Sequence, residues 1–178
     1  FSGCSTTSTT GRGAALYLAT SGKSANFHGG TEDGVNGVKI TGCRTVAPQG
    51  GAVDCVSGAK LNFEGNVHIL NNRLEGSTDQ HNVVLAHDNQ TTINTTAQGL
   101  GEDASIGVYV TDERMEKRGK KERDFGTFAS NSNLDAFMND RLPLVGGEDA
   151  NKAIAWSTAY TLVLDPNGGD GAAISVRL

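Results

Sequence analysis

Two stretches of the chain, GAALYL at 13–18 and GGAVDC at 50–55, follow the same pattern of small and apolar residues and start 37 residues apart (13 to 50). The stretches that follow them, SGKSANFHG at 21–29 and SGAKLNFEG at 57–65, align without a gap and start 36 residues apart (21 to 57). Self-similarity at a period between about 20 and 50 residues is typical of solenoids, propellers and other repeat arrays. The repeat therefore predicts the architecture of the chain, although it says little about its activity.

Inside each unit, apolar side chains alternate with polar ones over short runs that Gly, Ser, Asn and Thr separate. This period of two is typical of β-strands, whose successive side chains point to opposite faces. The alternation places Tyr17 and Asp54 outside, and it gives about three strands per unit. The inward pairs are Leu16/Leu18 with Val53/Cys55, Ala25/Phe27 with Leu61/Phe63, and Val38/Ile40 with Val67/Ile69. We expect an all-β fold, a right-handed parallel β-helix (β-solenoid); a propeller blade needs four antiparallel strands and is the weaker alternative.

The composition limits the possible partners and compartments. The 178 residues include 24 Gly and 3 Pro, which favours many tight corners. A net charge of −5 argues against a nucleic-acid partner, and no apolar run approaches the roughly 20 residues of a membrane span. The repeat unit already includes Phe1, so we expect the chain to be part of a longer multidomain protein.

The repeat also divides the chain. Residues 1–158 are expected to form the β-helix, and 159–178 to form terminal strands that cap it or begin a following module. Later strands are expected at 82–85, 91–95, 106–110, 125–128 and 153–156, whereas 134–138 fits either a strand or a short helix. Residues 111–124 contain six basic and five acidic side chains, with Gly119 among them. Because a stacked coil cannot bury so many charges, we expect a protruding loop there.

These residues resemble a known class of repeat. The stretches "SGKSANFHGG…VKITGC" and "SGAKLNFEGNVHILNN" are similar to right-handed β-helix repeats of large bacterial surface proteins, found in gut Firmicutes and in adhesin-like proteins. "YTLVLDPNGG" resembles the first strand of a Listeria–Bacteroides type repeat, a small β-grasp module. The resemblance implies an extracellular protein, secreted or attached to the cell wall. In the family, the places of Cys4 and Cys43 usually hold a turn Asn, which this chain keeps as Asn72.

Few residues suggest chemistry. Asp54, Glu64 and His68 could form a weak acidic site on the outer surface, as β-helix lyases and glycosidases do, but they lie on different strands. We expect them to be solvated. Glu32 and Asp33 with Asp54 could bind calcium through oxygen ligands, although their spacing matches no calcium loop; no other cofactor is expected.

The sequence does not decide the oxidation state of the cysteines. Cys4 and Cys43 should be neighbours on adjacent coils, either as buried thiols or as a disulfide. Cys55 lies on another strand and is expected to be a core thiol.

The preferred function is a non-catalytic stalk or adhesion segment that presents loops to a glycan or to a host or neighbouring surface protein. The expected contact residues are the basic ones of the charged loop, Arg114, Lys117, Arg118, Lys120, Lys121 and Arg123. The alternative is a carbohydrate-active β-helix enzyme, such as a polysaccharide lyase or glycosidase, or its accessory carbohydrate-binding domain.

Overall fold

The computed structural model describes residues 1–30, 37–85, 92–111, 124–129, 133–142, 144–148 and 153–158. In those ranges the regular elements are β-strands, apart from one 3-10 turn, η1 (Leu134–Ala136). Thirteen of these strands form one sheet, and two short ones, β4 (Arg44–Thr45) and β8 (Arg73–Leu74), pair with each other. The all-β class predicted from the sequence is confirmed.

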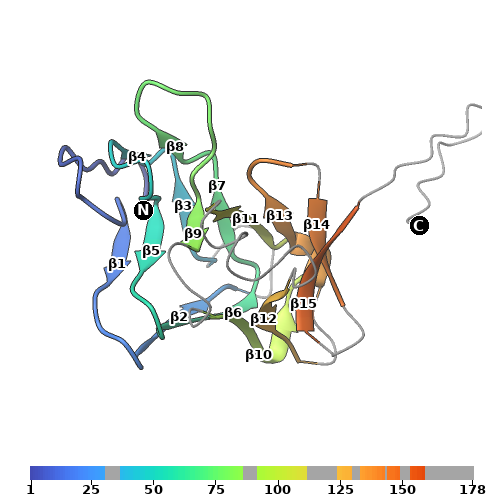
Figure 1. The fold of residues 1–178 in the computed structure, drawn as a ribbon. Helices are drawn as coiled ribbons and strands as arrows, with labels where there is room; N and C mark the ends of the chain where they lie inside the picture. Colours follow the sequence, from blue (N-terminus) through green and yellow to red (C-terminus); the bar gives the residue numbers. More distant parts are fainter. Residues whose placement is uncertain are drawn as a thin grey trace, which may run out of the picture.

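The first strand of each unit stacks on its counterpart in the next unit (Figure 1). β1 (Leu16–Leu18), β5 (Val53–Cys55) and β9 (Val83–Leu85) pair in parallel, with Leu16 opposite Val53 and Val53 opposite Val83. β9 then pairs with β11 (Ser105–Val110), which pairs with β13 (Phe137–Asn139). The register agrees with the repeat, because equivalent positions of successive units face each other.

The second strands form another parallel row. β2 (Ser24–His28) pairs with β6 (Lys60–Gly65), β6 with β10 (Thr92–Leu100), and β10 with β12 (Asp124–Thr127). Phe27 lies opposite Phe63, as the repeat predicts. Gly22 and Gly58, which precede the first two strands of this row, have φ angles of 71° and 75°. Glycine adopts this left-handed conformation at no steric cost, so the repeated Ser-Gly pair starts this row at the same corner in both units.

The third row is shorter. β3 (Lys39–Thr41) pairs in parallel with β7 (His68–Leu70), and β7 pairs with the first residues of β11. Ile40 and Ile69 face each other and are almost fully buried. The alternating side chains Lys39, Thr41, His68 and Leu70 therefore lie on the outer face of this row.

The C-terminal strands change the pattern. β14 (Leu144–Glu148) pairs antiparallel with β13 and with β15 (Ala153–Thr158), and β15 pairs antiparallel with β12. The described sheet is therefore mixed, and it nearly closes, because its strand order runs from β1 through β11 and β15 back to β2 (Figure 1). A uniform parallel β-helix over 1–158 is not confirmed. The physical reason is that the Gly-punctuated repeat does not continue into the segments that form β14 and β15.

The core follows the rows of inward side chains. The rings of Phe27 and Phe63 stack with centroids 4.7 Å apart, and Phe137 meets Phe63 edge-on at 6.1 Å. Trp156 is almost fully buried and anchors the C-terminal end of the core. The remaining fully buried side chains are mainly branched aliphatic residues, Val53, Leu61, Val67, Ile69, Val83, Leu85, Ile93 and Ile106 among them. In the described residues, no helix is long and apolar enough to cross a membrane.

The predicted elements 106–110, 125–128 and 153–156 correspond to β11, β12 and β15 within one or two residues at either end. For segment 134–138 the sequence allowed a short helix or a strand. The structure has a 3-10 turn followed by a strand. The charged segment 112–123 and the proposed terminal strands at 159–178 lie outside the described residues. Their predicted loop and module boundaries stay predictions.

Candidate functional site

A ladder of side-chain amides runs across the outer face of β2, β6, β10 and β12. Asn62 Nδ2 donates to Asn26 Oδ1 over 2.7 Å, and Asn94 Nδ2 donates to Asn62 Oδ1 over 2.9 Å. The hydroxyl of Thr127 donates to Asn94 Oδ1 and extends the row to a fourth strand. These side chains occupy the same position in successive units, so the parallel register brings them together. The result is a surface row of polar groups in fixed positions.

A second row on this face contains Glu64. Its carboxylate accepts a hydrogen bond of 2.6 Å from the Thr96 hydroxyl through Oε2, and its other oxygen contacts His28 Nδ1. The Thr96 hydrogen bond, followed by the His28 contact, lowers the pKa of Glu64 below its ordinary value. A carboxylate held ionised in this way is a poor general acid near neutral pH.

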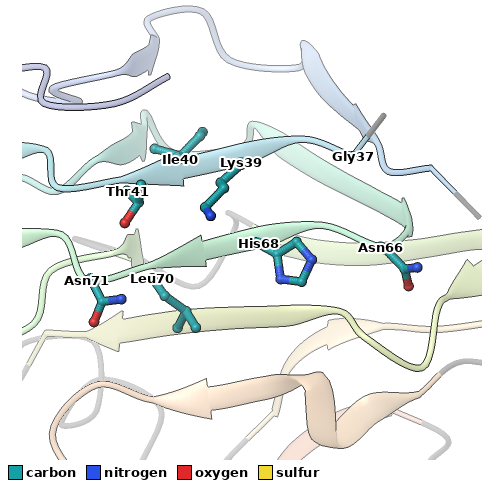
Figure 2. A pocket seen from close by; sticks show the side chains of 8 residues that line it. All are labelled: Gly37, Lys39, Ile40, Thr41, Asn66, His68, Leu70 and Asn71. Carbon is teal, nitrogen blue, oxygen red and sulfur yellow. The ribbon is translucent and has the colours of Figure 1, made fainter. Parts of the chain in front are cut away.

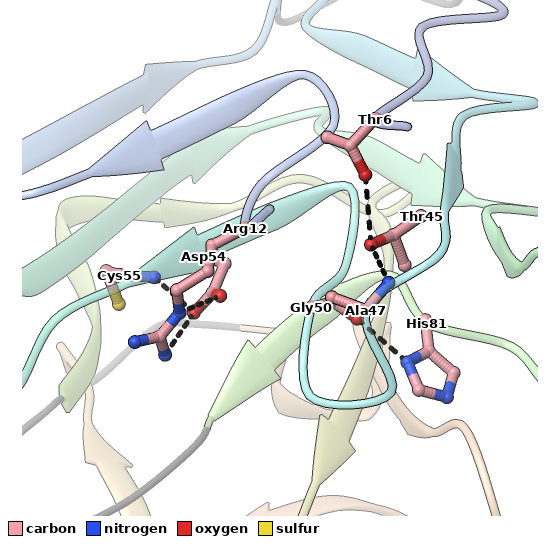
Figure 3. A network of polar contacts seen from close by, with 8 residues as sticks. All are labelled: Thr6, Arg12, Thr45, Ala47, Gly50, Asp54, Cys55 and His81. Atoms are coloured by element: carbon pink, nitrogen blue, oxygen red, sulfur yellow. Dashed lines mark hydrogen bonds and ion pairs between the residues drawn. The ribbon is translucent and has the colours of Figure 1, made fainter. Parts of the chain in front are cut away.

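Asp54 lies in a different environment from the one expected. Its side chain is fully buried, and it pairs with Arg12 through Nε–Oδ2 (2.7 Å) and Nη2–Oδ1 (3.2 Å), as Figure 3 shows. The Cys55 backbone N–H donates to the same carboxylate over 2.6 Å. The expectation of a solvated Asp54 is wrong. Strand alternation does turn Asp54 away from the core, but Arg12 lies over it, and a bidentate ion pair compensates the loss of water.

A buried polar network joins the corners of the units. Asn72 Nδ2 donates to the carbonyls of Ile40 and Leu70, while Asn72 Oδ1 accepts from the Cys43 N–H. Asn82 accepts from Asn72 and donates through its backbone and side-chain amides to Asp140 over 2.9 and 2.7 Å. Burial raises the pKa of Asp140 to about 6. This network fixes the corners, and it is too enclosed to be a contact surface.

His81 is also structural. Its Nδ1 lies 2.8 Å from the Gly50 carbonyl, which defines Nδ1 as the protonated nitrogen (Figure 3). The ring stacks on Tyr109 with centroids 4.1 Å apart and is nearly fully buried. Burial lowers its pKa below the ordinary value. The stacked aromatic ring and the carbonyl partner hold the imidazole inside the fold.

The outer face of β3 and β7 contains a pocket of about 280 Å³. Lys39 and His68 lie side by side on the two strands, while Thr41 and Leu70 lie at the other end of the same face (Figure 2). The Asn71 side chain lines that end, and Gly37 and Asn66 line the opposite end. A Cβ on Gly37 would lie 2.5 Å from the Asn66 carbonyl oxygen, so only glycine permits this close approach.

A second pocket of similar volume lies between residues 9–12 and 47–50. Its charged residue is Arg12, whose guanidinium is already engaged by Asp54. The β3–β7 pocket differs because no described residue forms an ion pair with its basic side chains, Lys39 and His68. It is therefore the better candidate for a binding site.

The residues proposed from sequence are separated by the fold. Asp54, Glu64 and His68 lie on β5, β6 and β7, one in each row, and the first two are already paired with Arg12 and with Thr96 and His28. His68 lines the pocket. The basic loop residues from Arg114 to Arg123 lie outside the described residues. Glu32 and Asp33 also lie outside them, and the described part of the chain contains no group of three or more His, Cys, Asp or Glu residues that could hold a metal ion.

Sequence reasoning missed Lys39 and the amide ladder. Both had a signal in the repeat, since Lys39 and His68 occupy one position in VKI and VHI, and Asn26 and Asn62 occupy another. Comparison of the chain with protein-family models, with curated proteins and with solved structures found no match. The resemblance to bacterial surface repeats therefore rests on the residues quoted for it, and the all-β fold is the part of it that the structure supports.

Proposed function

We propose that this chain is a non-catalytic β-structured segment of an extracellular bacterial surface protein, which presents binding faces to a glycan or to a neighbouring protein. The amide ladder of Asn26, Asn62 and Asn94 is the observation that carries this proposal. Parallel pairing and strand-to-strand hydrogen bonds hold its polar groups in place before any partner arrives. Groups that are ordered in advance lose less entropy on binding, which favours recognition of an extended polar ligand.

The proposal includes a finer view of the fold. The first two units pair in three parallel rows, with offsets of 37 residues (Leu16 to Val53), 36 residues (Phe27 to Phe63) and 29 residues (Ile40 to Ile69). These rows support successive coils of a β-helix that the C-terminal antiparallel strands close. Such a segment would act as a stalk as well as a contact surface. Wall attachment or secretion is part of the proposal through the resemblance of the repeats alone.

The alternative, a carbohydrate-active enzyme, fits the described residues less well. Glycosidases use two carboxyl groups about 5–10 Å apart on either side of the scissile bond. Asp54 is fully buried under Arg12, and Glu64 is held ionised on another row by Thr96 and His28. A carboxylate enclosed by an ion pair is not placed to donate a proton to a leaving group.

A glycan array combined with a degradation assay tests the proposal. The labelled chain should bind a restricted set of glycans, and the release of reducing or unsaturated ends from the same glycans should stay at the level of the buffer control. Release of such ends would support the enzyme instead. Failure to bind any glycan, together with failure to bind bacterial or host surface proteins in a direct assay, would contradict the proposed function.

A further inference from the structure

We infer that the pocket on the outer face of β3 and β7 binds a glycan unit that carries a carboxylate. This inference rests on the proposed function and names the class of ligand for one of its faces. It goes beyond the amide ladder, which contains no basic side chain and makes no distinction between neutral and acidic sugars.

The charge of the pocket points to an anion. Lys39 and His68 are directly opposite each other on neighbouring parallel strands, and both line the pocket. Ion pairs among the described residues use Arg12, His28 and Arg44, and neither Lys39 nor His68 has a side-chain partner within that part of the chain. Among the residues that the structure describes, the lining contains no Asp or Glu, although the whole chain has a net charge of −5. Two adjacent basic groups that lack a counter-charge in the described part of the chain are a place where an anion gains two charge-assisted hydrogen bonds.

The other lining groups fit the ring of a sugar better than a bare ion. Thr41 offers a hydroxyl and Asn71 an amide, and neither side chain is engaged with another described residue. Leu70 provides an apolar surface beside them, suited to the C–H face of a pyranose (Figure 2). The volume of about 280 Å³ is at the small end of ligand pockets, which suits one monosaccharide unit and excludes a larger cofactor.

The pocket is also held rigidly from below. The side chains of Ile40 and Ile69, which alternate with the outward-facing ones of β3 and β7, are 1% and 0% exposed in the core. Asn71, with φ of 59°, takes the left-handed conformation at the end of β7, and the buried Asn72 side chain binds the carbonyls of both strands. The Cα positions of Lys39 and His68 are therefore fixed by the core, and only their side chains need to order around a ligand.

The test compares the binding of a sugar acid with the binding of its uncharged methyl ester. Titration of the isotopically labelled chain with glucuronic acid and with methyl glucuronate, followed by amide NMR shifts, separates the carboxylate from the ring. Glucuronic acid should shift the amide signals of Lys39, Thr41, His68 and Asn71 saturably and lose affinity when salt is added. The methyl ester should bind about tenfold or more weakly, since it lacks the charge-assisted hydrogen bonds.

Variants assign the effect to the pocket. Lys39→Gln and His68→Gln should each weaken glucuronic acid binding and leave the weak binding of the ester unchanged. Lys60→Gln is the matched control, because Lys60 is an exposed strand lysine on another row. Circular dichroism and the unfolding midpoint check that each variant is folded. If Lys39→Gln does not fold, His68→Gln and the ester comparison still decide the question.

Three results would overturn the inference: equal binding of acid and ester, an equal loss in Lys60→Gln, or equally tight binding of an acidic hexapeptide. These are distinguishable from failure of the proposed function. If the glycan array shows binding to neutral glycans that Lys39→Gln leaves intact, the function stands and this pocket is not its site. If no glycan or protein binds at all, the function fails first.

Discussion

Phe63 and Phe137 are the two largest side chains that the core encloses completely. The Phe63 ring is fully buried between Phe27 and Phe137. Phe63→Ala should lower the free energy of unfolding by roughly 3–5 kcal/mol, through lost burial and the cavity left between the two rings. Urea denaturation measures this change. Phe1→Ala is the control and should have little effect, since Phe1 is 75% exposed; a loss below about 1 kcal/mol for Phe63→Ala would contradict the stacked core.

Two titratable residues, Asp140 and His81, should give opposite pH effects. Asp140 has a pKa raised to about 6 from an ordinary 3.8, so its contribution to stability is fully present below about pH 4 and is lost as the pH rises through 6. His81 has a lowered pKa, so its contribution is present at neutral pH and is lost as the pH falls below its ordinary 6.5. Between pH 7 and pH 5, acidification should therefore stabilise the fold through Asp140 and destabilise it through His81.

The variants separate the two effects. The measured quantity is the free energy of unfolding at pH 5 minus that at pH 7. Asp140→Asn should lower this difference by on the order of 1 kcal/mol, because one pKa unit corresponds to about 1.4 kcal/mol and part of the shift acts in this window. His81→Gln should raise it. A difference that Asp140→Asn leaves unchanged would mean that Asp140 titrates normally in the folded chain.

At the scale of elements, each Asn of the amide ladder should contribute to the free energy of unfolding in proportion to the number of ladder hydrogen bonds that it makes. Asn62 makes two ladder bonds, to Asn26 and from Asn94, whereas Asn26 makes one. With about 0.5–1.5 kcal/mol per net hydrogen bond, and less where water competes, Asn62→Ala should cost roughly 1–2 kcal/mol and Asn26→Ala about half of that. Urea denaturation of both variants measures this ratio. Equal costs would show that the ladder does not act as a row of coupled bonds.

The strand registers were the most predictable part of the fold. Leu16 with Val53, Phe27 with Phe63 and Ile40 with Ile69 follow from aligning the two units, because a one-residue slip would turn every inward side chain outward. The antiparallel strands β14 and β15 had no such guide. Their sequences do not repeat an earlier unit. Their alternation therefore predicts strands, but it does not predict which strands they pair with.

The candidate site was less predictable than the strands. Alternation tells which side chains leave the core, but not what covers them afterwards. Alternation alone predicts a solvated Asp54, because Arg12, the residue that lies over it, is 42 positions away in sequence. The repeat predicts that Lys39 and His68 occupy equivalent positions. The pocket is also lined by Gly37, Asn66 and Asn71, which lie at corners whose shape the repeat does not specify.

For the molecule as a whole, the described sheet nearly closes through β12 and β15. The N-terminal segment pairs with β3 and β4. Ser2 bridges to Thr41, Ser5 bridges to Arg44, and the N-terminal amine donates to the Lys39 carbonyl over 2.8 Å. This brings Cys4 beside Cys43, as the repeat predicts, and the two cysteines are free thiols. Burial raises the pKa of Cys43, which keeps its thiol protonated and slow to react.

The redox state of Cys4 and Cys43 therefore determines whether a covalent bond joins the first coil to the second. With free thiols, the midpoint of thermal unfolding should be the same with and without a reductant. A disulfide would instead close a loop of about 38 residues and stabilise the fold by roughly 3–4 kcal/mol in the chain-entropy model. For a chain of this length that corresponds to a fall of about 6–16 °C on reduction. Cys4→Ser, measured without reductant, is the companion experiment: it should leave the midpoint nearly unchanged, and a fall as large as that range would mean that oxidation ties the first coil to the second.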